Sequence, residues 1–426
     1  MSTGSIPAPA VRTSGLGYAF GALRHRDFRL FWVAALASNT GTWLQGIAAP
    51  YVLYRITGST TWLGFGAFCS FAPSVVLGPL AGSLADRIPR RRIVLVCQCV
   101  SMAVAVALWA LWAFDLMRPA AVVALLFVSG CASGINLTSW QAFVPQLVPP
   151  SSLPQAVRLN AFQFTLARAL GPALAGIVLS QLGPGANFAG NALSFVLVIT
   201  ALLMVSPRPL DLPPPKGRVR DQFRAGLTYV RAHRALLVAV VTIFVVGSCG
   251  MAAIQLTPAL ASEQFGVGRA AYGFLVSAYG LGAIGGSLVV SIAGERLPKS
   301  ALTTAGLALF GVGVLVLGLS PVYAVGLCGT FVMGIANASV GMSLNTAVQM
   351  RVDEAFRGRV MAVYLMCLMG GVPLGALVLG RVASVFGLEA ALIGSASVLL
   401  TAAALALAAP RVMRTLDDTH PLPLLR

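Results

Sequence analysis

Long apolar runs separated by short polar stretches recur along the whole chain. A helix needs about 20 consecutive, mostly apolar residues to cross a bilayer. Lipid offers backbone amides no hydrogen-bond partner, so each such run is expected to be helical. The pattern predicts an all-α membrane protein with twelve transmembrane helices. The predicted spans are residues 30–54, 62–85, 92–114, 119–143, 154–181, 186–205, 235–260, 270–293, 301–320, 321–348, 358–386 and 388–409.

Polar segments divide these spans into two sets of six. The expected parts are a cytoplasmic N-terminal arm (1–29), a six-helix bundle (30–205), a cytoplasmic linker (206–234), a second six-helix bundle (235–409) and a cytoplasmic tail (410–426). In the linker, Phe223, Leu227 and Val230 recur at helical spacing beside arginines. This spacing predicts a short amphipathic helix, which we expect to lie on the membrane surface.

A weak internal similarity relates the two halves. The stretch Asp86-Arg87-Ile88-Pro89-Arg90 corresponds to Glu295-Arg296-Leu297-Pro298-Lys299 further along the chain. Six helices, a linker and six more helices in the same orientation form a parallel repeat, an organisation that supports rocking of two bundles about a central site.

Composition supports the membrane assignment, and charge orients it. Of the 426 residues, 58% are hydrophobic and 10% are charged, and the formal net charge is +17. Of the 29 lysines and arginines, 24 fall on the face that carries both termini and four on the other. Cytoplasmic loops carry such an excess. We therefore expect a bacterial inner-membrane protein with both termini cytoplasmic, and no binding of nucleic acid.

Catalytic and metal-binding patterns are not evident. The seven cysteines lie in apolar segments without metal-ligand spacing, and the three histidines are far apart in the sequence. No phosphate-binding glycine loop is found. We expect no cofactor, no metal and no enzymatic activity.

Several motifs resemble those of one transporter family. Gly82-Ser83-Leu84-Ala85-Asp86-Arg87-Ile88-Pro89-Arg90-Arg91 is similar to the motif between helices two and three of the major facilitator superfamily, with Pro89 where glycine is usual. The stretches 38–45, 54–59, 168–176 and 357–361 resemble the transmembrane secretion effector branch, which includes siderophore and antibiotic exporters. The resemblance implies the major facilitator fold of two six-helix bundles.

The first motif predicts a gate. Gly82 permits close helix approach, and Asp86 lies at a helix end where it can meet arginines and a helix N-terminus of the other bundle. The alternative is that Asp86 only neutralises nearby arginines. The candidate gating residues are Gly82, Asp86, Arg87, Arg90, Arg91, Arg357, Gly358 and Arg359. A second motif, with Gly171, Pro172 and Gly176 in the fifth span, resembles the Gly-Pro motif associated with export.

Polar residues inside the spans identify candidate substrate contacts. The resemblance implies that spans one, four, seven and ten line the central cavity. Any one of these polar residues has interhelical hydrogen bonding as its alternative role. The candidates are Asn39, Trp43, Gln45, Asn136, Trp140, Arg168, Gln255, Tyr279, Asn337 and Asn345.

Arg168 is the only charged residue near the middle of a predicted span. It could bind an anionic substrate, or it could hydrogen-bond across the bundle. The resemblance to the major facilitator fold implies Asn39, Gln45 and Tyr279 as its neighbours. No acidic residue lies at mid-membrane depth, which weakens simple proton antiport of cations.

These observations predict a secondary active transporter that exports a small amphipathic molecule, such as a siderophore, drug or metabolite, by alternating access. An importer, or a non-transporting receptor or scaffold of the same fold, remains an alternative. The expected partners are a small-molecule substrate and the lipid bilayer, with the chain acting as a monomer.

Overall fold

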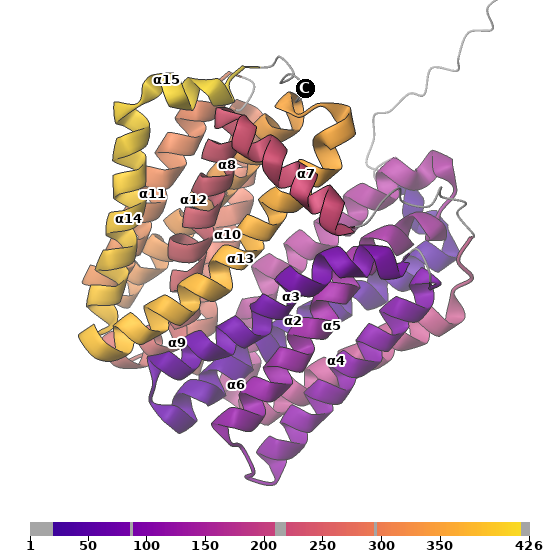
Figure 1. Cartoon of the computed structure of the whole chain (residues 1–426). Helices are drawn as coiled ribbons and strands as arrows, with labels where there is room; N and C mark the ends of the chain where they lie inside the picture. The colour runs from indigo at the N-terminus through magenta and orange to yellow at the C-terminus, as the bar shows by residue number, and fades with distance from the viewer. Residues whose placement is uncertain (1–19, 86–87, 209–218, 294–295, 419–426) are drawn as a thin grey trace, which may run out of the picture.

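The computed structural model describes residues 20–85, 88–208, 219–293 and 296–418, and all its regular elements in these ranges are helical (Figure 1). The long helices of the N-terminal half are α2 (Arg26–Thr57), α3 (Thr60–Ala85), α4 (Arg90–Ala113), α5 (Pro119–Phe143) and α6 (Leu153–Met204). Those of the C-terminal half are α8 (Arg234–Val245), α10 (Arg269–Ala293), α11 (Lys299–Leu319), α12 (Tyr323–Arg351), α13 (Glu354–Phe386) and α14 (Leu388–Ala408). The shorter helices include α7 (Val219–Ala232), α9 (Thr257–Ala259) and α15 (Pro410–Met413).

The described ranges contain twelve crossings. Ten helical segments are long and apolar enough to span a bilayer, with α6 counted once. The 52 residues of α6 form two crossings, because the backbone leaves the helix at Gly183 (φ 81°, ψ 176°) and Pro184 follows. The remaining crossing is α2, whose mean hydropathy is lowered by the polar stretch 38–45. The predicted all-α, twelve-helix organisation is confirmed.

The crossing between α8 and α10 is irregular. After α8 it continues through two π-helical turns, Val246–Met251 and Leu260–Gln264, with α9 between them. The glycines and Pro258 in this stretch explain the departure from regular α-helix, since they weaken or interrupt the backbone ladder.

We call the face that carries α7 and α15 the terminal face, and the opposite face, with the turns at Gly58 and Gly387, the distal face. The two halves meet toward the distal face (Figure 1). A Cβ on Gly64 of α3 would lie 2.3 Å from the carbonyl oxygen of Ala376 in α13. A Cβ on Gly176 of α6 would lie 2.8 Å from the Cα of Gly273 in α10. Only glycine lets the helices approach this closely.

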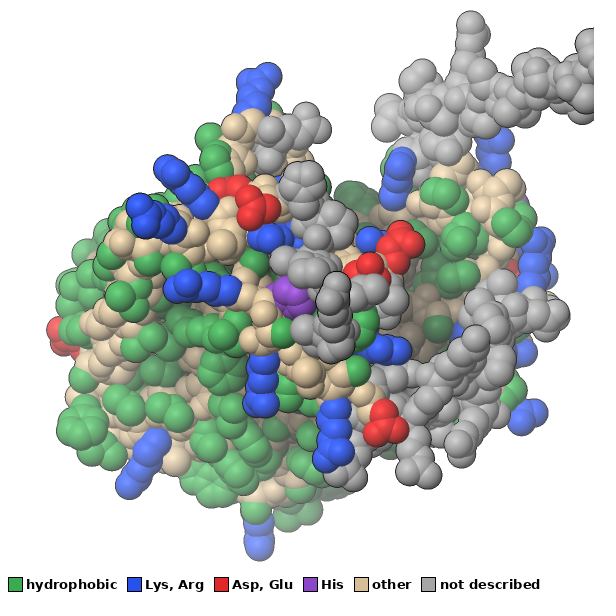
Figure 2. All heavy atoms as spheres, turned by 45° about the horizontal axis from the view of Figure 1, so that its top comes forward, with side chains coloured by type: hydrophobic (Ala, Val, Ile, Leu, Met, Phe, Trp, Pro, Cys, Tyr) green, Lys and Arg blue, Asp and Glu red, His purple; other side chains and the backbone are tan. Residues whose placement is uncertain are grey.

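Toward the terminal face the same helices separate. On α10, Gly273 and Gly280 are buried against α6, but Ile284 and Ser291, on the same face of the helix, are exposed. A Cβ on Gly285 would meet no atom within 4 Å. Figure 2, with the terminal face turned forward, shows the surface hollowed between the two halves. The molecule is closed at its distal face and open at its terminal face.

The linker helix α7 packs on the C-terminal half. The ring of Tyr229 stacks on Phe356 near the start of α13, with 4.7 Å between centroids. Tyr229 and Val230 are buried, and a Cβ on Gly226 would lie 2.6 Å from the carbonyl oxygen of Arg359. The predicted amphipathic helix therefore exists, but the expectation that its apolar face lies on lipid is wrong, because that face is covered by α13.

Candidate substrate cavity and gates

Arg168 lies where the two halves begin to separate. It is midway between Leu153, where α6 begins, and Gly183, where the first crossing of α6 ends. On the face of α6 that contains Arg168, Pro172 and the residues beyond it toward the distal face are buried. On the same face toward the terminal side, Thr165 is exposed, and Arg168 itself is half-buried. Its side chain therefore lies at the inner end of the opening.

The other half approaches Arg168 through α10. The guanidinium carbon lies 5.9 Å from the centre of the Tyr279 ring, within the range of a cation–π contact. A Cβ on Gly280 would lie 2.6 Å from the carbonyl oxygen of Arg168. Pro172 has no N–H, so that carbonyl lacks its usual helical donor. Arg168 thus marks a contact between the two halves.

Two residues of α2 lie beside this point. The indole of Trp43 packs on Gly171, where a Cβ would lie 2.5 Å from the indole Cδ1. Asn39 is one turn earlier on the same face of α2 and is half-buried, and its Nδ2 is buried without a hydrogen-bond partner in the described part of the chain. The parallel packing of α2 on α6 places Asn39 level with Arg168.

In the C-terminal half, α12 presents a half-exposed polar stripe. Asn337, Gly341 and Asn345 recur every fourth residue, and a Cβ on Gly341 would meet nothing within 4 Å. The Oδ1 of Asn345 accepts a hydrogen bond of 2.5 Å from Gln349. Gln255 is also half-buried. These positions are compatible with the predicted cavity wall.

Two candidates lie in the core of the N-terminal half instead. Gln45 is buried, and its Oε1 accepts a hydrogen bond of 3.0 Å from Asn191. Trp140 is 2% exposed and donates to Asn160 through Nε1 at 3.2 Å. Both residues are buried and hydrogen-bonded between helices, so this structure does not support their assignment to the cavity. The alternative role, interhelical hydrogen bonding, describes both.

Polar residues that sequence reasoning missed lie nearby. Asn187 and Asn191 form hydrogen bonds within the N-terminal half, and Gln163 is fully buried with both amide atoms unpartnered in the described part of the chain. Asn136, which was among the predicted cavity residues, is half-buried, and its buried Oδ1 likewise lacks a partner there. Polar residues within apolar spans were the available signal, but their helix faces could not be assigned without the packing.

The residues of the Gly-Pro motif lie at helix–helix packing contacts. Gly171 accommodates Trp43 within the N-terminal half, and Gly176 and the carbonyl of Pro172 both face Gly273 of the other half. The motif thereby permits close contact between the halves at the distal side.

Distal closure is reinforced by side chains from both halves. The hydroxyl of Tyr54 donates a hydrogen bond to the carboxylate of Glu263. The Thr60 hydroxyl donates to the carbonyl oxygen of Gly380 at 2.9 Å. The guanidinium of Arg269 lies 5.7 Å from the centre of the Tyr51 ring. Sequence reasoning did not identify this gate, because its partners are about 200 or more residues apart.

Part of the predicted terminal gate lies outside the described residues. The described gate residues have their contacts within their own half. Asp86 and Arg87 are not described, nor are the surroundings of Gly82. Arg90 and Arg91 donate to carbonyls of their own half: Ala142 at 3.2 Å, and Leu202 and Leu203 at 2.6 and 2.8 Å. Gly358 is exposed, Arg359 lies over Phe356, and Arg357 pairs with Glu354 of its own helix at 3.9 Å. Contact between Asp86 and this segment stays a prediction.

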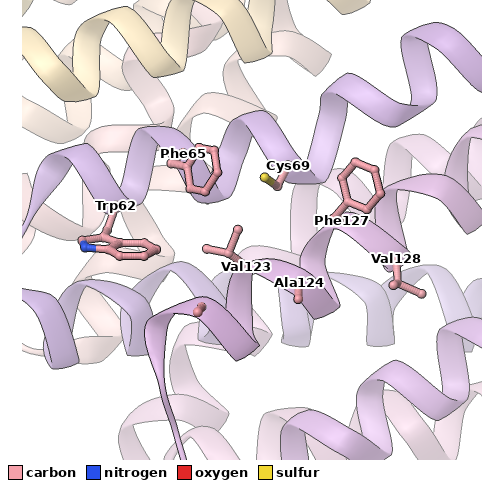
Figure 3. A pocket seen from close by; sticks show the side chains of 8 residues that line it. Trp62, Phe65, Cys69, Val123, Ala124, Phe127 and Val128 are labelled. Carbon is pink, nitrogen blue, oxygen red and sulfur yellow. The ribbon is translucent and has the colours of Figure 1, made fainter.

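A pocket of about 440 Å³ lies between α3 and α5 (Figure 3). Trp62, Phe65 and Phe127 are among its lining side chains, which are all apolar. Phe65 and Phe127 are exposed on the outer surface, which faces lipid. This pocket therefore lacks the polar groups expected of the substrate site.

Within the described ranges, no three His, Cys, Asp or Glu side chains are grouped to hold a metal ion.

Comparisons with known proteins agree with this architecture. The family described as transmembrane secretion effector matches residues 18–422. The staphyloferrin A transporter of Staphylococcus aureus is 21% identical over 361 residues, which cover 84% of this chain and 90% of that protein. The enterobactin exporter EntS of Shigella boydii is 26% identical over 368 residues, covering 84% and 85%.

Solved structures show the same fold. The nucleoside transporter NupG aligns with a TM-score of 0.76 at 13% identity, over 90% of this chain and 99% of that one. A bacterial homologue of the lysosomal transporter Spinster, in an inward-facing and unoccupied conformation, aligns with a TM-score of 0.73 at 14% identity, over 95% and 99%. The major facilitator fold implied by the sequence motifs is confirmed.

Proposed function

Because this chain belongs to the transmembrane secretion effector family of secondary transporters, we propose that it exports a small amphipathic molecule from the cytoplasm. The observation that carries the proposal is an opening between the two halves, with polar side chains at its inner end, closed at the distal face by contacts that join the halves. The similarity to the staphyloferrin A transporter and the enterobactin exporter supports a substrate of similar size and mixed polarity.

The proposed orientation places the terminal face in the cytoplasm. The excess of arginine and lysine on that face supports it, since cytoplasmic loops carry such an excess. With this orientation the structure is the inward-open state, in which substrate enters from the cytoplasm. Export then requires the distal contacts to break and the terminal ends of the halves to come together.

The proposed cycle uses the two gates in turn. At the distal face, the contacts of Tyr54 with Glu263 and of Gly176 with Gly273 close the cavity to the outside. At the terminal face, Asp86 would meet the start of α13 near Arg357 when the halves close. A bound substrate favours this exchange only if it interacts differently with the two states.

Uptake into vesicles of defined orientation tests the proposal. Inside-out vesicles that contain the protein should accumulate an amphipathic fluorescent dye when a proton gradient is imposed, and vesicles without the protein should not. Right-side-out vesicles should show no protein-dependent accumulation. Accumulation in right-side-out vesicles alone would identify an importer, and binding without accumulation in either preparation would indicate a receptor.

A further inference from the structure

Among the described residues, no carboxylate forms an ion pair with the guanidinium of Arg168. The guanidinium lies midway along a crossing of the membrane, where an ionised side chain is costly unless it faces water or a partner. Ion pairs in the described part of the chain include Arg351 with Asp418 and Arg357 with Glu354, both at the terminal face and not at Arg168. The described acidic residues all lie at helix ends or in turns.

Tyr279 is one polar neighbour of Arg168, but a purely structural role for a charge at this depth needs several acceptors. Gln45, an expected partner, is hydrogen-bonded to Asn191. The unpartnered atom of Asn39 is Nδ2, which can only donate, as can the guanidinium. The Tyr279 hydroxyl is buried and close enough to the guanidinium to accept a hydrogen bond from it, which leaves the hydroxyl proton free to donate. Three donors therefore converge near the inner end of the opening.

We propose that Arg168, Asn39, Trp43 and Tyr279 form an anion-binding site, and that the transported molecule is an aromatic organic anion; this rests on the proposed transport function. The planar guanidinium matches the two oxygens of a carboxylate or sulfonate. Trp43 and Tyr279 supply aromatic surface beside the charge. The bound anion provides a counter-charge to the guanidinium.

The position of the site links binding to rocking. Arg168, Asn39 and Trp43 belong to the N-terminal half, and Tyr279 belongs to the C-terminal half. A ligand held between them touches both bundles at the point where they diverge. Neutralising Arg168 also lowers the cost of enclosing this charge when the terminal side closes.

The test is a binding titration of the full chain in lipid nanodiscs, with two bicyclic probes of fixed charge. Naphthalene-1-sulfonate is the anion and N-methylquinolinium the cation, and binding to empty nanodiscs is subtracted. Wild type should bind the anion about tenfold or more tightly than the cation. Arg168→Gln should weaken anion binding about tenfold or more and leave cation binding no weaker, since hydrogen bonds to charged groups are the strong ones.

Two further variants separate binding from folding. Arg168→Lys keeps the positive charge but lacks the planar guanidinium that can donate two parallel hydrogen bonds. It should therefore give an intermediate affinity for the anion. Arg158→Gln, the same change at an exposed position on the same helix, should bind as wild type. Melting curves without ligand should be alike for all variants. Lower melting of both Arg168 variants, with anion binding unchanged, would assign Arg168 a structural role and overturn the proposal.

Transport of the same probes distinguishes this proposal from the function on which it rests. If wild-type vesicles accumulate N-methylquinolinium and not the sulfonate, the transport function stands and the anion site is wrong. If they accumulate neither probe, the titration still decides the site: loss of sulfonate binding in Arg168→Gln supports it, and equal binding in wild type and Arg168→Gln rejects it.

Discussion

The hydroxyl of Tyr54 in α2 donates a hydrogen bond to the carboxylate of Glu263, and this bond joins the two halves at the distal face. Tyr54 is buried and Glu263 is exposed, so one side of the bond is open to water. A hydrogen bond in this setting contributes about 0.5–1.5 kcal/mol. It is one of several contacts that close this face, and its removal should shift the balance between states without unfolding either half.

Tyr54→Phe is therefore expected to increase the distal-open population by about threefold to tenfold. The measurement is labelling of Gly46→Cys, a position where a Cβ would meet no atom within 4 Å, by an impermeant maleimide added at the distal side. The matched control is Glu389→Gln, which removes an exposed carboxylate of the same face and should leave labelling unchanged. Equal labelling of Tyr54→Phe and wild type would show that the bond does not hold the gate.

Gly273→Val should force the halves apart at the distal face. The added Cβ would lie 2.6 Å from the Cα of Gly176 and 2.6 Å from the carbonyl oxygen of Pro172, so the close approach of α10 to α6 cannot persist. Overpacking of this kind costs about 1–3 kcal/mol. Spin labels at the exposed positions Asp115 and Glu389 should move apart, and vesicle transport should fall about tenfold or more.

Gly285→Val is the control for this variant, because it makes the same change on the same helix where a Cβ meets nothing within 4 Å. Its label distance in this state should match wild type. If both valine variants increased the distance alike, the change would reflect valine in α10 and not the contact with Gly176.

Tyr229→Ala should destabilise the C-terminal half. The ring is fully buried between α7 and α13 and stacks on Phe356, and burial raises the pKa of its phenol above the usual value. Loss of a buried aromatic ring costs about 3–5 kcal/mol. The melting temperature of the purified protein should fall clearly, whereas Thr228→Ala, at an exposed neighbouring position, should melt as wild type. Unchanged melting of Tyr229→Ala would mean that α7 is only a tether.

Asp86→Asn is expected to weaken closure of the terminal face. A charge-assisted hydrogen bond contributes about 1.5–3 kcal/mol, enough to shift a balanced two-state equilibrium about tenfold or more. Transport should fall while the amount of protein in the membrane stays normal. Asp115→Asn, an exposed change at the distal face, serves as control. Wild-type transport by Asp86→Asn would leave that carboxylate the lesser role of neutralising nearby arginines.

Topology can be measured on a chain whose seven native cysteines are replaced. Thr415→Cys, in the short helical segment after α15, should react with an impermeant reagent only from the cytoplasmic side. Gly268→Cys, exposed in the turn before α10, should react only from outside. The reverse pattern would invert the proposed orientation and turn the observed state into an outward-open one.

The sequence by itself determined the number of crossings, their approximate limits and the two-bundle organisation. Apolar run length is enough for this, because lipid permits no other backbone state than a helix over such runs. Even the polar α2 was predicted, since its charges lie only near its ends. Motif resemblance was sufficient for the family, and the central position of Arg168 in its span followed from counting residues.

Only the tertiary structure decided which polar residues face the opening and which are enclosed. Gln45 and Trp43 are two residues apart on α2, yet Gln45 is bonded to Asn191 inside the N-terminal half and Trp43 packs on Gly171, one helical turn from Arg168. Apolar spans have lipid on one side and protein on the other, so periodicity alone does not separate packing from cavity. The distal gate of Tyr54 and Glu263 also required the fold, because the relative position of two bundles is set by contacts between distant segments and not by local propensity.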